Sequence, residues 1–204
     1  MGGEIPSNEK ILLVSVDTGV DYTHPDLINN IWINQKEIPG WVFELPDLDD
    51  GDGILTAIEI SDFMETQTNS LGESLDFRDA LLTASPFANG IDDDGNGYVD
   101  DILGWDVSGM SGNEDNDPFP KTGIDITDDG GWAHGTHVAG ILGATTDNGL
   151  GMSSSAFDLK IMSVKASKEK KMDVDGVTFV DVDDPMIDNG YEGMLYGAYT
   201  GYVN

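Results

Sequence analysis

"HGTHVAGILGA", residues 134–144, begins with two histidines three apart, and its part "HVAGILGA" at 137–144 has the spacing of a helix. The Gly and Ala residues of this helix allow close packing against neighbouring elements. The run "ILLVSV" at 11–16 is short, continuous and apolar, as is typical of a buried strand in a parallel sheet. "LKIMSVKA" at 159–166 predicts a second strand, and "YEGMLYGAYTGYV" at 191–203 predicts a second helix. Strands that alternate with helices predict an α/β layered fold.

Two histidines open the first of these helices, and three interpretations of them compete. A zinc helix of the HExxH type needs histidines at i and i+4 and a glutamate between them, whereas His134 and His137 are three apart with no glutamate. A structural histidine at a helix start is the plain alternative. The third is a catalytic base, whose ring the helix dipole keeps neutral. Such a base needs a carboxylate to fix its tautomer, and Asp17, at the carboxyl end of the first strand, is the matching candidate.

The charge of the chain excludes several classes of partner. Its 204 residues include 39 acidic and 9 basic side chains, for a formal charge of −30. Such a surface repels nucleic acid and anionic lipid, and it favours either high salt or bound cations. The absence of cysteine excludes disulfides and thiolate chemistry. No apolar run approaches the roughly 20 residues of a membrane span, and the first ten residues lack the basic and apolar regions of a signal peptide.

The acidic loop "DDDGNG", residues 92–97, has the opening pattern of a calcium loop, in which alternate side chains aim their oxygens at one hard cation. The alternate residues are Asp92, Asp94 and Asn96. The closing glutamate of an EF-hand is absent, because Leu103 stands in its place, and this leaves Asp100 or Asp101 to close the loop. The alternative is a solvated acidic turn.

A second acidic loop, residues 47–59, is similar to the later part of an EF-hand loop. The matching ligands are Asp50, Asp52 and Glu59. Leu48 occupies the first position and cannot ligate through its side chain, so Asp47 or Asp49 would have to substitute. Pro46 argues against a normal incoming helix, and a solvated turn is again the alternative.

Two segments interrupt the alternation of strands and helices. Residues 40–89 carry acidic turns and two helix-like pieces, at 55–67 and 75–85, and we interpret them as an insertion. Residues 167–190 join a basic patch to an acidic one, which predicts an irregular, solvated excursion.

Two motifs, taken in order along the chain, resemble those of the subtilisin-like serine peptidases, the subtilases. "VSVDTGVDYTHPDL" at 14–27 is similar to the aspartate motif of that family, and "HGTHVAG" at 134–140 is similar to its histidine motif. "NGIDDDGNGYVDDILGWD" at 89–106 is a stretch that many subtilases carry between the two. The resemblance implies a parallel sheet with helices on both faces, here incomplete and carrying the acidic insertion.

The resemblance also implies roles for individual residues. Asp17 would be the orienting acid, His134 the general base, and His137 a structural residue packed beneath the site. Asp26, in "HPDL", and Asp147, in the loop after the histidine helix, match positions that hold a calcium ion in the family. Trp132-Ala133 departs from the family, which usually has a small polar residue before the base, and this puts the substrate contacts there in doubt.

The expected activity is that of a serine endopeptidase stabilised by calcium, acting on protein or peptide substrates outside the cell or at its surface. The serine motif of the family, of the type Gly-Thr-Ser-Met-Ala, is absent from residues 1–204. The serines in glycine-containing loops, Ser108, Ser111 and Ser153–Ser155, lack its context. We therefore expect residues 1–204 to be part of a catalytic domain whose partner is the C-terminal part that carries the serine. The alternative is a calcium-binding surface or adhesion module that keeps a decayed subtilase scaffold.

Overall fold

The computed structural model describes residues 11–81, 85–109, 114–120 and 131–203. Two features of the sequence analysis lie outside the described residues: the first ten residues, which lack a signal-peptide pattern, and Ser111.

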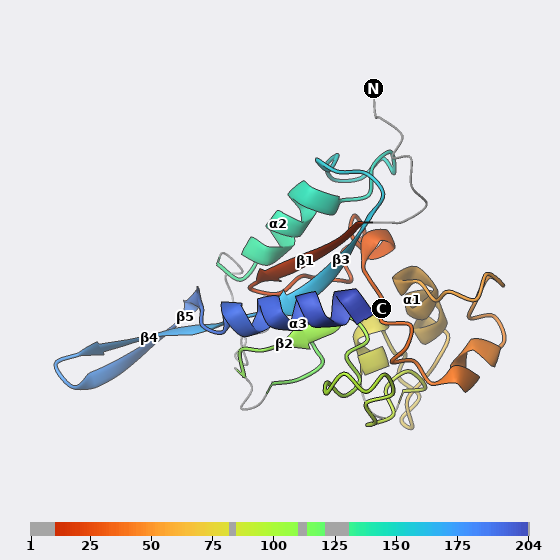
Figure 1. Cartoon of the computed structure of the whole chain (residues 1–204), viewed down its shortest axis with the longest axis horizontal. Helices are drawn as coiled ribbons and strands as arrows, with labels where there is room; N and C mark the ends of the chain where they lie inside the picture. Colours follow the sequence, from red (N-terminus) through yellow and green to blue (C-terminus); the bar gives the residue numbers. More distant parts are fainter. Residues whose placement is uncertain (1–10, 82–84, 110–113, 121–130, 204) are drawn as a thin grey trace.

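The centre of the molecule is a parallel sheet of three strands, in the order β1-β3-β2 (Figure 1). β1 (Ile11–Asp17) and β3 (Leu159–Lys165) pair in register along their whole length, and both strands were predicted from sequence. β2 (Gly104–Asp106) pairs with the other edge of β3 and was not predicted. Since all three strands are parallel, their carboxyl ends meet at one edge of the sheet, where functional residues of α/β proteins gather.

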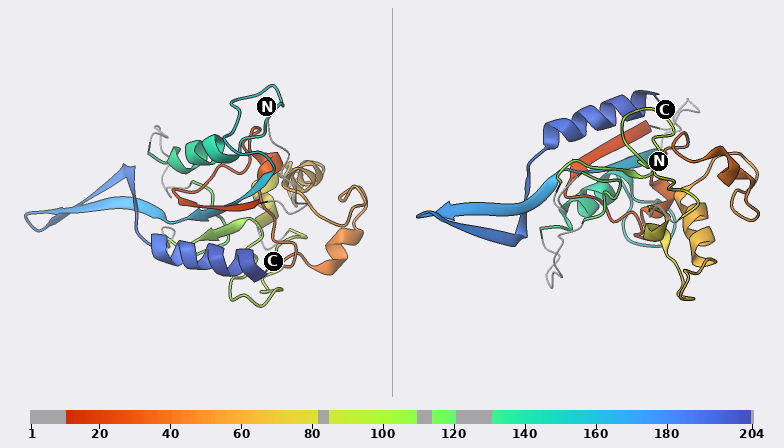
Figure 2. Two further views of the ribbon diagram at one scale, coloured as in Figure 1. Left: turned by 45° about the horizontal axis from the view of Figure 1, so that its top comes forward. Right: turned by 90° about the horizontal axis from the view of Figure 1, so that it is seen from below.

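Two helices cover opposite faces of this sheet, as Figures 1 and 2 show. α2 (His134–Gly143) packs on the face that carries Leu13 and Ile161, and α3 (Gly190–Val203) packs on the face that carries Val14 and Val164. Adjacent strand residues point to opposite faces, so each strand contributes to both layers. The predicted α/β fold with helices on both faces is confirmed.

Glycines let α3 lie close against the strands. A methyl group added at Gly197 would lie 2.4 Å from a carbon of Val14, and one at Gly193 would lie 2.7 Å from a carbon of Val16. Tyr196, which is fully buried between them, supplies the volume of this layer. The "YEGMLYGAYTG" pattern therefore places Gly193, Gly197 and Tyr196 on the side of the sheet, whereas Leu195 and Tyr199 are exposed.

The described residues of the segment 40–89 share one apolar core with α2 and β3. They contain two 3₁₀ helices, η2 (Gly40–Glu44) and η3 (Phe77–Leu81), and the helix α1 (Ala57–Glu65). A third 3₁₀ helix, η1 (Ile28–Asn30), precedes them. α1 begins with a capping box, in which Thr56 and Glu59 bond each other's backbone N–H groups. That this stretch is an insertion stays a prediction.

Residues 167–190 are an excursion from the body, but the prediction that they are irregular was wrong. β4 (Ser167–Val174) and β5 (Val177–Ile187) form an antiparallel hairpin that projects from the carboxyl edge of the sheet (Figure 1). Asp175 and Gly176 both have positive φ, 53° and 81°, as a two-residue type I′ turn requires. Asp-Gly between two runs of alternating polar and apolar residues is the sequence signal for such a hairpin. The many charged residues around it favoured the interpretation as a solvated loop instead.

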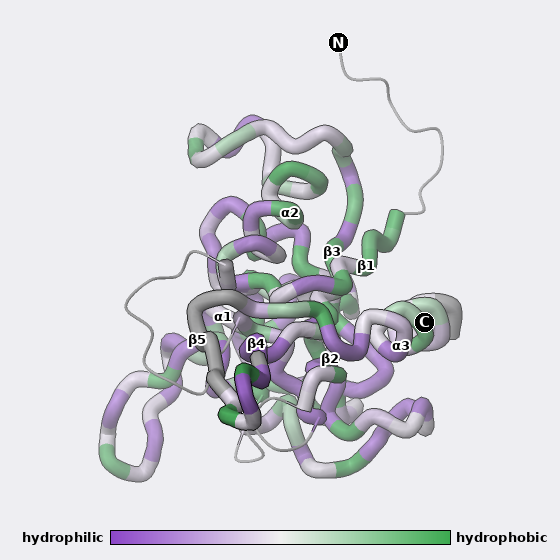
Figure 3. Tube along the Cα trace, turned by 90° about the vertical axis from the view of Figure 1, so that its left-hand side faces the viewer, coloured by the Kyte–Doolittle hydropathy of each residue, from purple (hydrophilic) through white to green (hydrophobic). Residues whose placement is uncertain are grey.

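The distribution of hydropathy along the chain follows this layered arrangement. In Figure 3, green hydrophobic stretches mark β1, β3 and α3, whereas the outer loops include long purple, hydrophilic stretches. Among the described residues, none of the helices combines the length and apolar character needed to cross a membrane.

Candidate active site

Asp17 and His134 lie side by side at the carboxyl edge of the sheet. Asp17 is the last residue of β1, and His134 is the first residue of α2. The Nδ1 atom of His134 lies 2.8 Å from Oδ1 and 3.0 Å from Oδ2 of Asp17. The predicted geometry, with the ring at a helix N-terminus and within hydrogen-bond reach of Asp17, is confirmed.

This contact decides which ring nitrogen is free to act. A neutral imidazole carries its proton on one nitrogen and a lone pair on the other. With the Nδ1–H donated to the Asp17 carboxylate, the Nε2 atom of His134 keeps the lone pair and can accept a proton. The backbone N–H of Thr18 donates to Oδ1 of Asp17 at 2.7 Å and so fixes the carboxylate as well.

The pair opens into a cleft of about 400 Å³. Asp17, His134 and His137 form its floor with Thr18 and Gly131, and the base of the hairpin contributes Ser167, Pro185 and Ile187. The side chain of Asp17 is 16% exposed and that of His134 is 66% exposed, so the acid is shielded while the base faces the cleft. This is the arrangement that a proton-transfer group needs in order to meet an external substrate.

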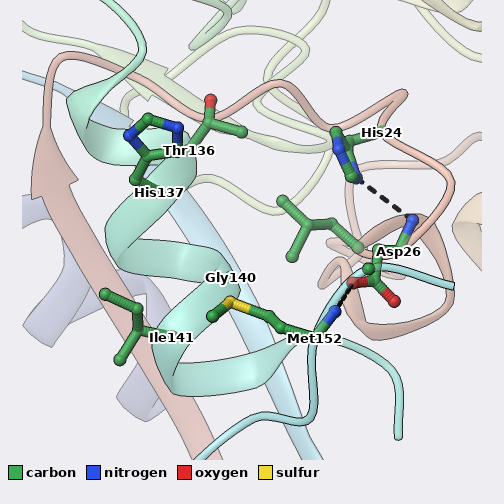
Figure 4. A pocket seen from close by; sticks show the side chains of 9 residues that line it. His24, Asp26, Thr136, His137, Gly140, Ile141 and Met152 are labelled. Atoms are coloured by element: carbon green, nitrogen blue, oxygen red, sulfur yellow. Dashed lines mark hydrogen bonds between the residues drawn. The ribbon is translucent and has the colours of Figure 1, made fainter. Parts of the chain in front are cut away.

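The expectation that His137 packs beneath the site was wrong, because its side chain is exposed. The buried side of α2 consists of Gly135, Ala139 and Gly143, which follow one another at intervals of four. His137 follows His134 by three positions and therefore shares the open side of the helix. It lines the cleft of the pair and also a second pocket, shown in Figure 4.

At the far end of that second pocket, Asp26 holds the loop that follows α2. Asp26 is 3% exposed, and its carboxylate accepts a hydrogen bond from the Asn148 side chain at 2.8 Å. It also accepts one from the Met152 backbone at 3.1 Å, which Figure 4 shows. Asp147 is exposed, with φ of 63°. The neighbouring Asn148, and not Asp147, is the residue that contacts Asp26.

In the loop 92–97, the structure adds a carboxylate that the sequence did not reveal. Single oxygens of Glu37, Asp92 and Asp94 lie within 4.8 Å of one another. Glu37 is fully buried and accepts the backbone N–H groups of Asp94 and Asp100, at 3.1 and 2.7 Å. Burial raises the pKa of Glu37 to about 7. No sequence signal marks Glu37, which comes from the segment after η1 and meets the loop only in the folded chain.

Asp100 and Asp101, the two residues that could close this loop, have different surroundings. The Asp100 carboxylate turns away and accepts the backbone N–H groups of residues 89 and 90. Asp101 is fully buried and accepts hydrogen bonds from Asn96 at 3.0 Å, from Asn34 at 2.9 Å and from the Tyr196 hydroxyl at 2.8 Å. Burial raises the pKa of Asp101 to about 7.

In the loop 47–59, Asp49 joins Asp50 and Asp52 to form a group of three carboxylates. Asp49 is one of the two residues considered as a substitute for Leu48, whose side chain is buried. Glu59 is engaged elsewhere, because its carboxylate accepts the backbone N–H groups of Thr56 and Asp50 at 2.8 and 3.0 Å. Glu59 thus caps α1 in this structure.

A buried ion pair next to the active site was also missed from sequence. Lys165 and Asp106 end β3 and β2, and both side chains are fully buried. The Lys165 ammonium donates to the Asp106 carboxylate at 3.1 Å, to the Ser108 hydroxyl at 2.6 Å and to the Ser167 carbonyl at 2.7 Å. Since Lys165 is also the register partner of Asp17, this ion pair begins on the strand next to the one that carries the acid. Lys165, a charged residue at the end of the mainly apolar run 161–164, was the available signal.

Comparison with known proteins identifies the family. The subtilase family model matches residues 8–178. Two proteins called Subtilisin-like protease 1 are each 27% identical to the chain. The match to the Plasmodium vivax protein spans 157 residues, which is 77% of this chain and 15% of that protein. The match to the Plasmodium falciparum (isolate 3D7) protein spans 185 residues, which is 91% of this chain and 18% of that protein. The chain therefore spans less than a fifth of the length of these relatives. With the family model covering most of its length, and the expected Asp17–His134 contact in place, the chain belongs to the subtilase family.

Proposed function

We propose that this chain supplies the acid and the base of a subtilisin-type serine endopeptidase. The observation that carries the proposal is the 2.8 Å contact between His134 Nδ1 and Asp17. His134 Nε2 takes the proton from a serine hydroxyl while the serine oxygen attacks the peptide carbonyl, and Asp17 stabilises the resulting imidazolium. His134 then returns the proton to the leaving amine, and water hydrolyses the acyl-enzyme by the same proton route.

The nucleophile of this mechanism is proposed to come from a different segment. Ser108 is buried, and its hydroxyl donates to the Asp106 carboxylate and accepts from the Lys165 ammonium. Ser154 is also buried and donates to the Ala156 carbonyl. Ser167 lines the cleft, but its hydroxyl lies 3.3 Å from the Asp17 carbonyl oxygen, to which it donates. None of these hydroxyls meets Nε2 of His134 through a contact that the structure describes.

A fluorophosphonate probe, which labels activated serines, tests this assignment. The chain of residues 1–204 is expected to remain unlabelled, because no serine among the described residues contacts Nε2 of His134 and the Gly-Thr-Ser-Met-Ala type of motif is absent from the sequence. Adding the polypeptide segment that carries the serine is expected to restore labelling, and His134→Ala is then expected to abolish it. Ser167→Ala is the matched control and should label as the parent does. Stoichiometric labelling of residues 1–204 alone would show that the nucleophile lies within them.

We also propose that calcium binds between Glu37 and the loop 92–97. Three carboxylates that converge in a chain of charge −30 repel one another unless a cation lies between them. The amide nitrogen of Asn34 faces Asp94 and Asp101 at 3.0 and 2.9 Å, while its oxygen is buried with no hydrogen-bond partner among the described residues. If the Asn34 amide were turned over, its oxygen would take the place of its nitrogen beside Asp94. A bound cation would favour that orientation, because the oxygen could then serve as a ligand.

Two further calcium sites are weaker proposals. The exposed cluster of Asp49, Asp50 and Asp52 offers three carboxylates, and Glu59 would have to leave its cap on α1 to complete the set. Asp26 offers one buried carboxylate, and Asp147, in the loop that follows α2, is exposed. Calcium sites of modest affinity fill in extracellular fluid, so the same proposal places the protein outside the cell or at its surface.

Chelation is expected to lower the melting temperature by about 5–10 °C, since a ligand at 100 times its Kd contributes about 2.7 kcal/mol. Calcium should restore the melting temperature more fully than equal magnesium, which keeps its waters and demands octahedral geometry. Asp92→Ala with Asp94→Ala should remove most of the shift. Asp50→Ala with Asp52→Ala is the matched control and should remove less. A melting temperature that a chelator leaves unchanged would contradict all of the proposed sites.

The pH dependence of this effect follows from Glu37. Its pKa in the folded chain, about 7, lies above the ordinary value of 4.5. Between these two values the folded chain binds more protons than the unfolded chain, so the metal-free protein should lose stability as the pH rises through that window. Calcium must displace the proton from Glu37, so its stabilising effect should be larger above pH 7 than at about pH 5.

A further inference from the structure

The hydroxyl of Thr18 joins the two elements that carry the acid and the base. Thr18 follows Asp17 directly and is 5% exposed. Its Oγ1 donates to the carbonyl of Trp132 and accepts from the backbone N–H of Gly135, each at 2.9 Å. Trp132 and Gly135 stand on either side of His134 along the chain. One hydroxyl therefore holds the backbone on both sides of the base.

The start of α2 depends on this hydroxyl because the helix lacks a cap of its own. The first N–H groups of a helix have no partner within the helix and are usually satisfied by the side chain of the N-cap residue. The N-cap residue here is Ala133, which makes no side-chain hydrogen bond. Thr18, the residue directly after β1, supplies the missing acceptor, because its hydroxyl accepts the backbone N–H of Gly135.

The contact also tolerates little displacement. A methyl group added at Gly135 would lie 2.2 Å from the carbonyl oxygen of Gly19, so the helix backbone rests directly on the end of β1. Thr18 makes one more contact at this site: its backbone N–H donates to Oδ1 of Asp17. Thr18 therefore fixes the carboxylate through its backbone and the imidazole through its side chain.

We propose that Thr18 is a positioning residue that sets His134 against Asp17 through its hydroxyl. Its catalytic consequence rests on the proposed peptidase function, whereas its structural consequence can be measured in residues 1–204. Loss of the hydroxyl frees the first turn of α2 and lets the imidazole move relative to the carboxylate. A displacement of about 1 Å between catalytic groups costs roughly 10²-fold in rate.

The test compares Thr18→Val, which keeps the shape of the side chain without the hydroxyl, with Thr18→Ser, which keeps the hydroxyl. Nitrogen NMR of the His134 ring, at a pH where the ring is neutral, reports which nitrogen carries the proton. The parent and Thr18→Ser should show the proton on Nδ1, and Thr18→Val should show a mixture of tautomers. Amide exchange at Gly135 should accelerate roughly fivefold in Thr18→Val, the scale of a lost helix cap.

Thr136→Val is the matched control. The Thr136 hydroxyl also accepts a backbone N–H, that of Asp21, at 2.9 Å, and it lies in the same turn of α2. Its loss should leave the tautomer of His134 unchanged even if the melting temperature falls as far as in Thr18→Val. Asp17→Asn should abolish the Nδ1 preference and so validate the readout.

Three results would overturn the proposal: an unchanged tautomer in Thr18→Val, loss of the Nδ1 preference in Thr18→Ser, or equal loss in Thr136→Val. In the active peptidase, Thr18→Val should lower kcat by about 10²-fold with KM little changed, and Thr18→Ser should restore it. The NMR result does not need activity. An inactive protein with the expected tautomers would therefore refute the proposed function and leave the role of Thr18 intact.

Discussion

Asp17→Asn is expected to lower kcat of the active peptidase by about 10⁴-fold, with a much smaller change in KM. Asparagine keeps the size of the side chain but can present its amide N–H to the imidazole. Nδ1 of His134 would then have to accept a hydrogen bond, and the proton would move to Nε2, the atom that should take the proton from serine. The loss comes from this tautomer and from the missing negative charge beside the imidazolium.

Asp21→Asn is the matched control for this substitution. Asp21 lies four positions further along the same motif, and among the described residues its carboxylate accepts hydrogen bonds from Thr23 alone, at 3.0 and 2.6 Å. It should lower kcat less than tenfold. Melting curves of both variants would show that they fold alike. A loss below tenfold in Asp17→Asn would mean that the 2.8 Å contact to His134 does not serve catalysis.

The central sheet and its helices could be predicted because their signals are local. A strand buried on both faces is expected to be mainly apolar, and "ILLVSV", in which only Ser15 is polar, shows this without any knowledge of its neighbours. β2, at Gly104–Asp106, is too short to show a pattern. Its place beside β3 depends on Trp105 and Val107 filling the layer beneath α3, which only the folded chain reveals.

The acid and base of the site were likewise visible because each ends or begins a predicted element. Glu37 and Lys165 were not, since a buried charge acquires its meaning from partners far along the chain. Lys165 meets Asp106, which lies 59 positions earlier, and Glu37 meets Asp94, which lies 57 positions later. His137 was misplaced for a different reason. The family resemblance gave it a structural role, whereas the helix geometry, with glycine and alanine on the buried side, assigns it to the open one.

Lys165→Met is expected to lower the free energy of unfolding by about 3–5 kcal/mol, the usual cost of breaking a buried ion pair from one side. Methionine fits the space of the lysine stem, so the loss does not come from a cavity. It comes from the Asp106 carboxylate, which stays fully buried without its cation. The melting temperature of a chain of this size should fall by roughly 6–20 °C.

The companion variant replaces both partners, as Lys165→Met with Asp106→Leu. It should regain most of the lost stability, because no charge then remains buried, although the Ser167 carbonyl still loses its donor. Lys168→Met is the matched control at the surface. Its partner is Asp188, and both side chains are about a third exposed, at 32% and 34%, so solvent weakens the pair and the change should stay below about 1 kcal/mol.

Urea denaturation of the three variants separates the possible causes. If Lys165→Met and Lys168→Met cost the same, burial of the Lys165–Asp106 pair does not determine its energy. If the double variant is as unstable as Lys165→Met alone, the lost stability belongs to the lysine contacts with Ser108 and Ser167, not to an orphaned carboxylate. Because Lys165 is paired in register with Asp17, stability restored without activity would further show that this ion pair holds the carboxyl ends of the strands where the acid requires them.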